Sequence, residues 1–324
     1  LGAPPPAAPA IADAADPESV PGPAEGAAAV VVSRLADATI GIVGDHPAGF
    51  DPCAYDADAL AAAVGVRADP ASLPELFARA ESADDGAVGE VRRRVGETLA
   101  GSDELDEAEL DRSLRLHCGL RGLVDDRSWS AVATRCWPEC FTEFGGACCS
   151  PHAMLNDDGI PGCCEADAYG AVTSLILQWL GGGPAFVADM VNLDLDGDTA
   201  VLWHCGLAPL AMAGEEAVPR ATVHSNRRKP LLNEFPLRPG RVTIGRLSQS
   251  RGVTRLTIGG GEMLNAPRPF SGTGGVIRFD RPAGAVMDTI MSEGHEHHYG
   301  VVYGDIRGEL RALAAQLRLP VLDL

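Results

Sequence analysis

The pattern of apolar residues changes at Gly181–Pro184, and this change constrains the fold more than any other feature of the sequence. Before it, short β-branched runs alternate with segments whose apolar residues recur every three or four positions, which is typical of parallel βαβ units. The sequence predicts strands at 39–43 and 131–136, with a further short β-branched run at 29–33, and helices at 58–64, 72–79, 84–99, 106–123 and 165–180. We therefore expect a Rossmann-like α/β domain over residues 31–183.

After Pro184 the chain changes to short apolar runs separated by Gly and Pro, the pattern of strands joined by turns. The expected strands lie at 185–191, 200–204, 241–247, 253–258 and 275–279, followed by a βαβ-like unit at 298–303, 306–317 and 319–322. The glycine clusters at 259–261 and 272–275 stand between such runs and predict hairpin turns. We expect residues 184–324 to form a β-rich, barrel-like domain.

Residues 1–30 are dominated by Ala, Pro and Gly and predict a linker or tail. The sequence has no uncharged apolar run of the roughly 18 residues that span a bilayer, and its first residues do not resemble a secretory signal. The nine cysteines are odd in number, and seven of them crowd into residues 136–205, unlike the framework of a secreted disulfide-rich domain. We therefore expect reduced thiols and a cytoplasmic protein.

The charge balance excludes some classes of partner. Lys and Arg number 26 against 45 Asp and Glu, which gives a formal net charge of −19. Such a field repels phosphate backbones and anionic lipid surfaces, so neither nucleic acid nor a membrane is expected as a partner. The sequence also has no phosphate-binding loop and no nucleophile elbow, which argues against nucleotide kinases and serine hydrolases.

Four residues form a candidate cation site. Glu165 is expected in the first turn of a helix and Asp189 late in the next strand, whereas His204 lies in a Trp-His-Cys-Gly segment and His298 begins a late strand. Carboxylates with imidazole suit a cation such as manganese or magnesium. Each residue also has a structural explanation, as a first-turn acid, a strand-end cap or a core histidine. Zinc bound by cysteines is less favoured, because no C-x-x-C is present; the candidates are Cys136, Cys140, Cys148, Cys149, Cys163 and Cys164.

A family resemblance distinguishes between these alternatives. Five segments carry it: GIVGDHPAGFDPCAYD at 41–56, RCWPECFTEFGGACCS at 135–150, GIPGCCEADAYGAVTSLIL at 159–177, WHCGLAP at 203–209 and HHYGVVYGD at 297–305. From about Thr39 to the last residue the chain resembles the L-fucose isomerase and L-arabinose isomerase family, particularly its smaller fucose-isomerase-related members.

The resemblance implies roles for individual residues. In that family a Glu and an Asp 24 residues later bind manganese and exchange substrate protons, and here 189 − 165 = 24 selects Glu165 and Asp189. The third ligand is a His five residues before a Tyr-Gly pair, which selects His298, and arabinose isomerases add a fourth near His204. The substrate contacts implied by motif position are Arg135, Trp137 and Asn226.

The implied function is isomerisation of a free aldose such as L-fucose or an arabinose to its ketose through an enediol. It would require manganese or another divalent cation but no nucleotide, and the protein would be a homo-oligomer. Full-length family members place another α/β domain before the one that begins near Thr39, so this chain is expected to lack it. The alternative is therefore a non-catalytic metal- or sugar-binding module, or an inactive fragment.

Overall fold

The computed structural model describes residues 22–324, and the predicted tail at 1–21 lies outside them. Residues 23–30 were also assigned to the tail, but they open helix α1 (Pro23–Asp37), so this part of the prediction is wrong. The β-branched run at 29–33 lies in this helix, because Ala28, Val31 and Leu35 recur at helical spacing and are all buried.

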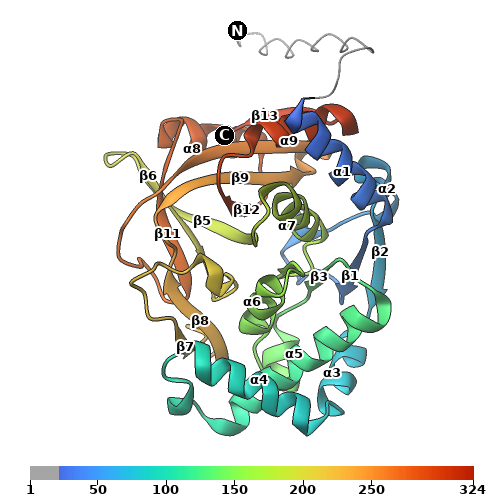
Figure 1. The fold of residues 1–324 in the computed structure, drawn as a ribbon, viewed down its shortest axis with the longest axis vertical. Coiled ribbons are helices and arrows are strands. Elements are labelled where there is room, and N and C mark those ends of the chain that lie inside the picture. The colour runs from blue at the N-terminus through green and yellow to red at the C-terminus, as the bar shows by residue number, and fades with distance from the viewer. Residues whose placement is uncertain (1–21) are drawn as a thin grey trace.

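The first half of the chain forms a four-stranded parallel sheet with the order β2-β1-β3-β4. Its strands are β1 (Thr39–Val43), β2 (Arg67–Ala71), β3 (Ala131–Thr134) and β4 (Gly162–Cys163). The intervening helices are α2 (Ala57–Val64), α3 (Leu73–Glu81), α4 (Asp85–Thr98), α5 (Glu107–Arg127), α6 (Cys149–Asp157) and α7 (Ala168–Gly181). The predicted parallel α/β arrangement is confirmed, and it lies beside the second sheet in Figure 1.

The second half of the chain is built on a nine-stranded sheet. Its strands are β5 (Phe186–Asp194), β6 (Thr199–His204), β7 (Arg220–Val223), β8 (Pro230–Pro236), β9 (Gly240–Ser248), β10 (Arg255–Met263), β11 (Thr273–Phe279), β12 (His298–Tyr303) and β13 (Val321–Asp323). Within residues 22–324, six of them close into a barrel in the order β10-β9-β12-β5-β6-β11, because β11 also pairs with β10. The predicted barrel-like architecture is confirmed, with α8 (Ala283–Glu293) and α9 (Arg307–Leu317) as added helices.

The glycine cluster at 259–261 is not a hairpin turn as predicted, because all three residues lie inside β10. There β10 pairs with β9 on one side and with β11 on the other, where the barrel closes. A Cβ on Gly261 would lie 2.4 Å from the carbonyl oxygen of Arg278. Glycine in a strand often marks such a close backbone approach, and sequence alone does not separate it from a turn.

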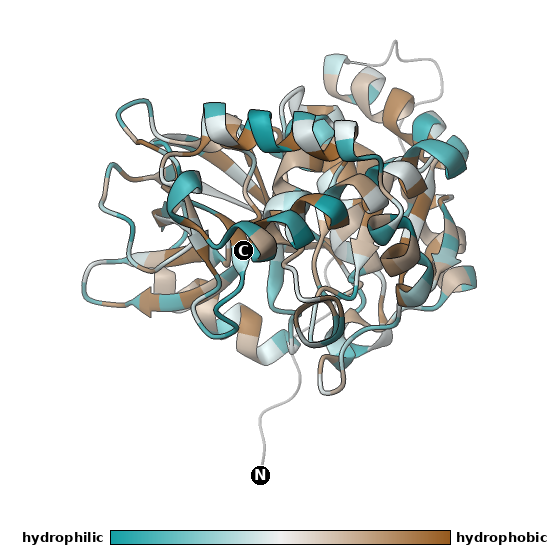
Figure 2. Cartoon of the chain, turned by 90° about the horizontal axis from the view of Figure 1, so that it is seen from below, coloured by the Kyte–Doolittle hydropathy of each residue, from teal (hydrophilic) through white to brown (hydrophobic). Residues whose placement is uncertain are grey.

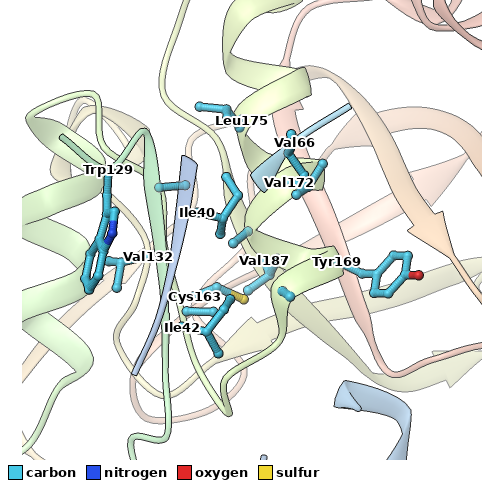
Figure 3. Packing of buried hydrophobic residues seen from close by; sticks show 14 of the residues in the cluster. Ile40, Ile42, Val66, Trp129, Val132, Cys163, Tyr169, Val172, Leu175 and Val187 are labelled. Atoms are coloured by element: carbon cyan, nitrogen blue, oxygen red, sulfur yellow. The ribbon is translucent and has the colours of Figure 1, made fainter. Parts of the chain in front are cut away.

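Helix α7 lies between the two sheets and fixes their relative position. It contacts β1 and β3 on one side and β9 and β12 on the other. Val172 and Leu175 of α7 pack near Ile40 of β1 in Figure 3. On the barrel side, Gly300 of β12 lacks a side chain where Leu177 lies, since a Cβ there would be 2.5 Å from the Leu177 Cδ1 atom. The second half of α7 is thereby held against the start of β12.

The helices show mixed hydropathy in Figure 2, as expected of helices that rest one face on a core. Among residues 22–324 no helix combines the length and the apolarity that crossing a membrane requires.

Replacing Gly41 in β1 with Ala is expected to lower the free energy of unfolding by about 1–3 kcal/mol. The new Cβ would lie 2.0 Å from the Cε3 atom of Trp129, which is buried and cannot move without disturbing the core. Gly89→Ala in α4 is the control, because nothing lies within 4 Å of its added methyl group. That change should stabilise the protein by up to about 1 kcal/mol. Urea unfolding measures both, and equal effects would contradict the packing at Gly41.

Candidate active site

The loop between β4 and α7 presents Glu165. The helix was expected to begin at Glu165, but it begins at Ala168, and Asp167 is its N-cap, accepting a hydrogen bond from the backbone N–H of Gly170 at 2.8 Å. Aspartate is a strong N-cap residue, whereas Glu165 and Ala166 have left-handed backbones with φ of 62° and 52°. Such conformations are uncommon for residues other than glycine and cluster at functional sites. Glu165 therefore projects from a loop rather than from a helix turn.

Asp189, His204 and His298 come from three neighbouring barrel strands. His298 of β12 lies directly opposite Asp189 of β5, and Asp189 lies opposite Trp203 of β6. Residues that face each other across paired strands have adjacent side chains, which brings Asp189 and His298 together. His204 follows Trp203, and its ring centre lies 5.6 Å from that of His298. The pairing of strands thus gathers residues that are distant in sequence.

The four predicted ligands fall into two groups of potential ligand atoms that share His298: Glu165 with Cys53 and His297, and Asp189 with His204. The two groups meet at the Nε2 atom of His298. This atom lies 3.8 Å from Oε2 of Glu165 and 3.8 Å from Oδ1 of Asp189. The nearest donor atoms of Asp189, His204 and His298 all lie within 4.8 Å of one another. Within residues 22–324, Nε2 of His298 and Oδ1 of Asp189 are both buried without a hydrogen-bond partner. Buried polar atoms are normally satisfied, so two unpartnered ones that face each other fit a bound cation.

Asp167 and Arg246 hold His298 in place, and the sequence did not reveal either role. Asp167 accepts from Nδ1 of His298 at 2.9 Å, and Arg246 donates to both carboxylate oxygens at 2.5 and 3.0 Å. The Arg246 and Asp167 side chains are 0% and 1% exposed. Burial by itself raises the pKa of Asp167. The charge of Arg246 and the hydrogen bond from His298 lower it by a larger amount, so the pKa lies well below its usual range. An ionised Asp167 keeps the proton on Nδ1, so the Nε2 lone pair is left for a ligand.

Glu165 lies among several further polar groups. Its Oε2 atom is 2.9 Å from Nε2 of His297, and its Oε1 atom accepts from the indole N–H of Trp137 at 3.4 Å. The Cys53 thiol donates to Oε2 at 3.7 Å. Burial raises the pKa of Glu165, but the hydrogen bond from His297 and the charge of His298 outweigh it and leave the pKa lowered. Glu165 is therefore an ionised carboxylate next to a histidine that can exchange a proton with it.

The ring of His204 lies between this site and a group of thiols. Its Nδ1 atom is 3.3 Å from the Cys205 sulfur and accepts from the Cys205 backbone N–H at 2.9 Å. Burial lowers the pKa of His204, but the nearby Cys205 and Asp189 outweigh burial and raise it. A cation that binds through His204 therefore has to displace a proton from its ring.

The three residues predicted to contact substrate, Arg135, Trp137 and Asn226, lie at different distances from the candidate site. Trp137 lies against Glu165, as described above. The Arg135 guanidinium is held by Glu139 at 2.7 and 2.6 Å and donates to the His46 carbonyl at 3.0 Å. Asn226 is exposed on the turn between β7 and β8. The structure brings Trp137 to the candidate site, whereas it does not bring Arg135 and Asn226 into contact with the four ligands.

The cysteines of the predicted alternative metal site do not converge as a set, although Cys164 lies with His204 and Cys205 in one group of potential ligands. Cys140 and Cys148 have sulfurs 3.4 Å apart, but Cys163 lies instead with Asp167 and His298. Among the described residues, no cluster of potential metal ligands contains Cys136, Cys140 or Cys148.

Comparisons with known proteins show which proteins this chain is similar to. The family model for the L-fucose isomerase C-terminal domain matches residues 202–324, which include His204 and His298. The sulfoquinovose isomerase of Alkalicoccus urumqiensis is 32% identical over 295 residues, 90% of this chain and 66% of that protein. Those of Clostridium sp. (34% over 292 residues) and Priestia megaterium (31% over 291 residues) each align with 89% of this chain and 65% of their own length. The chain thus spans just under two thirds of the length of these relatives, and over about nine tenths of its own length it is homologous to these fucose isomerase-related proteins.

Proposed function

We propose that this chain carries the metal and sugar site of an aldose-ketose isomerase, and that its substrate is a sulfonated hexose, sulfoquinovose. The observation that supports the proposal most strongly is the unpartnered Nε2 atom of His298, which faces the carboxylates of Glu165 and Asp189. The choice of sugar rests on the relatives, which are named sulfoquinovose isomerases. L-fucose and the arabinoses are the other candidates that the family suggests.

Glu165, Asp189 and His298 would hold a divalent cation, with His204 as a fourth ligand. Carboxylate oxygens with imidazole favour manganese or magnesium, and when bound such a cation would polarise the sugar oxygens at C1 and C2 and acidify the C2 proton. Glu165 is the proposed base that removes this proton, and His297 at 2.9 Å can share it. Asp189 is placed to move the hydroxyl proton. Asp167 and Arg246 keep His298 oriented, and Phe50 with Trp137 forms an apolar edge of the site.

Other parts of the proposal come from the sequence. Manganese without a nucleotide cofactor and a homo-oligomeric assembly follow from the family resemblance, a cytoplasmic location follows from the cysteine pattern, and a Rossmann-like classification of residues 31–183 follows from the alternation of strands and helices. The alternative function is a metal- and sugar-binding module without turnover.

An assay of ketose formation distinguishes the two functions. The chain would be stripped of metal with a chelator, supplied with manganese, and incubated with sulfoquinovose, L-fucose, L-arabinose and D-arabinose, with products followed by NMR. We expect manganese-dependent ketose from sulfoquinovose and less from the other sugars. Manganese binding without any ketose would support the module, and failure to bind manganese would contradict the assignment of the ligands.

A further inference from the structure

The turn between β7 and β8 carries two neighbouring arginines, and one of them lies against the candidate site. The Arg227 Cζ atom is 5.2 Å from the centre of the Trp137 ring, within the range of a cation–π contact. Within residues 22–324 Arg227 makes no ion pair, whereas Arg135 and Lys229 each pair with a glutamate. Arg228, next in sequence and equally exposed, has no such aromatic contact in this part of the chain.

Trp137 connects Arg227 to the candidate site. One edge of its indole donates to Glu165 at 3.4 Å, and Arg227 lies over its face. Phe50 packs edge-on against Trp137 at 5.0 Å and against His297 at 5.7 Å between ring centres. Arg227 therefore stands at the outer end of an aromatic wall whose inner end is Glu165 with His297.

The turn that carries Arg227 is held by its own contacts. The Nδ1 atom of His224 accepts from the backbone N–H groups of Asn226 at 3.2 Å and Arg227 at 3.3 Å. The His224 ring in turn packs edge-on against Phe141 at 5.1 Å. At the base of the turn, Lys229 pairs with Glu109. A backbone fixed before a ligand arrives lowers the entropy that binding has to offset.

Because the surroundings of the site are acidic, an anionic ligand needs a cation at the end of the site where Arg227 lies. Glu165, Asp189 and Asp167 are acidic, and the chain as a whole has a formal charge of −19. An anionic group on a sugar would be repelled by these charges unless a cation met it. A guanidinium that rests its face on an indole keeps the N–H groups at its edge for the oxygens of an anion.

We infer that Arg227 binds the C6 sulfonate of a sugar whose C1 and C2 oxygens lie at Glu165, Asp189 and His298. This inference rests on the proposed function, and it names the residue that would distinguish a sulfonated hexose from glucose. A phosphate at the same carbon shares the chemistry of a tetrahedral anion. The single guanidinium matches the one charge of a sulfonate, whereas it would leave half the charge of a dianionic phosphate uncompensated in a chain of formal charge −19.

The test is ligand binding to the manganese-supplied chain, measured by NMR titration with sulfoquinovose, glucose and glucose 6-phosphate. Arg227→Gln is expected to weaken sulfoquinovose binding by roughly 10- to 100-fold, the usual range for loss of one charge-assisted hydrogen-bonded contact. Glucose binding should not change, and Arg227→Lys should recover part of the loss. Arg228→Gln removes the same charge one residue away and should change sulfoquinovose binding less than about twofold, since exposed charges that touch nothing contribute little.

Four results would overturn the inference. The first is that the unmodified chain does not bind sulfoquinovose, and the second is that Arg227→Gln and Arg228→Gln weaken its binding equally. The third is that Arg227→Gln weakens glucose binding as much as sulfoquinovose binding, which would show that Arg227 only supports the turn. The fourth is that glucose 6-phosphate binds more tightly than sulfoquinovose. Ketose formation is measured separately. Arg227-dependent binding without ketose would contradict the proposed isomerase and leave the sulfonate site supported.

Discussion

Glu165→Gln is expected to lower kcat for sugar isomerisation by about 10²- to 10⁴-fold, the contribution usual for a general base. Glutamine has nearly the same size and can still accept from the indole N–H of Trp137, but it cannot take up the C2 proton. The measurement is the rate of ketose formation at saturating manganese, with manganese affinity determined in parallel by electron paramagnetic resonance. A loss of rate at full manganese occupancy assigns the effect to the base rather than to metal loss.

Glu143→Gln is the matched control for that change. Glu143 is an exposed carboxylate in the π-helical turn Cys140–Phe144, so its replacement should leave the rate unchanged. Ketose formation at an undiminished rate in Glu165→Gln would remove Glu165 from the reaction.

The second large effect concerns the buried pair of Asp167 and Arg246. Asp167→Asn is expected to lower the free energy of unfolding by about 3–5 kcal/mol, because it leaves the Arg246 charge buried without a counterion. Asparagine can still cap α7, so the loss reports the ion pair rather than the cap. Urea unfolding measures the change. Adding Arg246→Met to Asp167→Asn should recover much of the stability, since the orphaned charge is then removed.

An exposed pair provides the control for this prediction. Arg93 and Glu97 lie 2.8 Å apart on α4, with both side chains 60% exposed, and Glu97→Gln should cost no more than about 0.5 kcal/mol. If Asp167→Asn cost as little as Glu97→Gln, the buried pair would not hold the start of α7.

The same pair predicts how stability depends on pH. The pKa of Asp167 is lowered in the folded protein, so its contribution is fully present above the unfolded pKa of about 3.9. That contribution is lost as the pH falls from there toward the lower folded pKa. The stability difference between the unmodified chain and Asp167→Asn should therefore be constant near neutral pH and shrink only below about pH 4.

The sequence predicted the parts of the fold that local pattern controls. Strands and helices with clear periodicity, such as β1 and α5, lie where expected, as does the start of β12 at His298. The hairpin turn predicted at Gly259–Gly261 was wrong, because these glycines lie in a strand where the barrel closes. Closure depends on the pairing of β10 with β11, which no local sequence pattern indicates.

The support of the candidate site could not be predicted for a similar reason. Asp167 and Arg246 are 79 residues apart, and Asp167 by itself has the pattern of a helix cap. The contact of His297 with Glu165 was also missed, since the family spacing pointed only to its neighbour His298. These contacts arise from the docking of α7 on β9 and β12, which brings together segments that do not influence each other in sequence.

The central claim is that Glu165, Asp189 and His298 hold a cation at which a C2 proton is removed from a sugar. The most direct test follows sulfoquinovose by NMR in D₂O with the chain, first treated with chelator and then supplied with manganese. We predict that ketose forms only with manganese and that deuterium enters C1 of the ketose and C2 of the recovered aldose. Ketose that forms without manganese, or without any deuterium, would contradict the account.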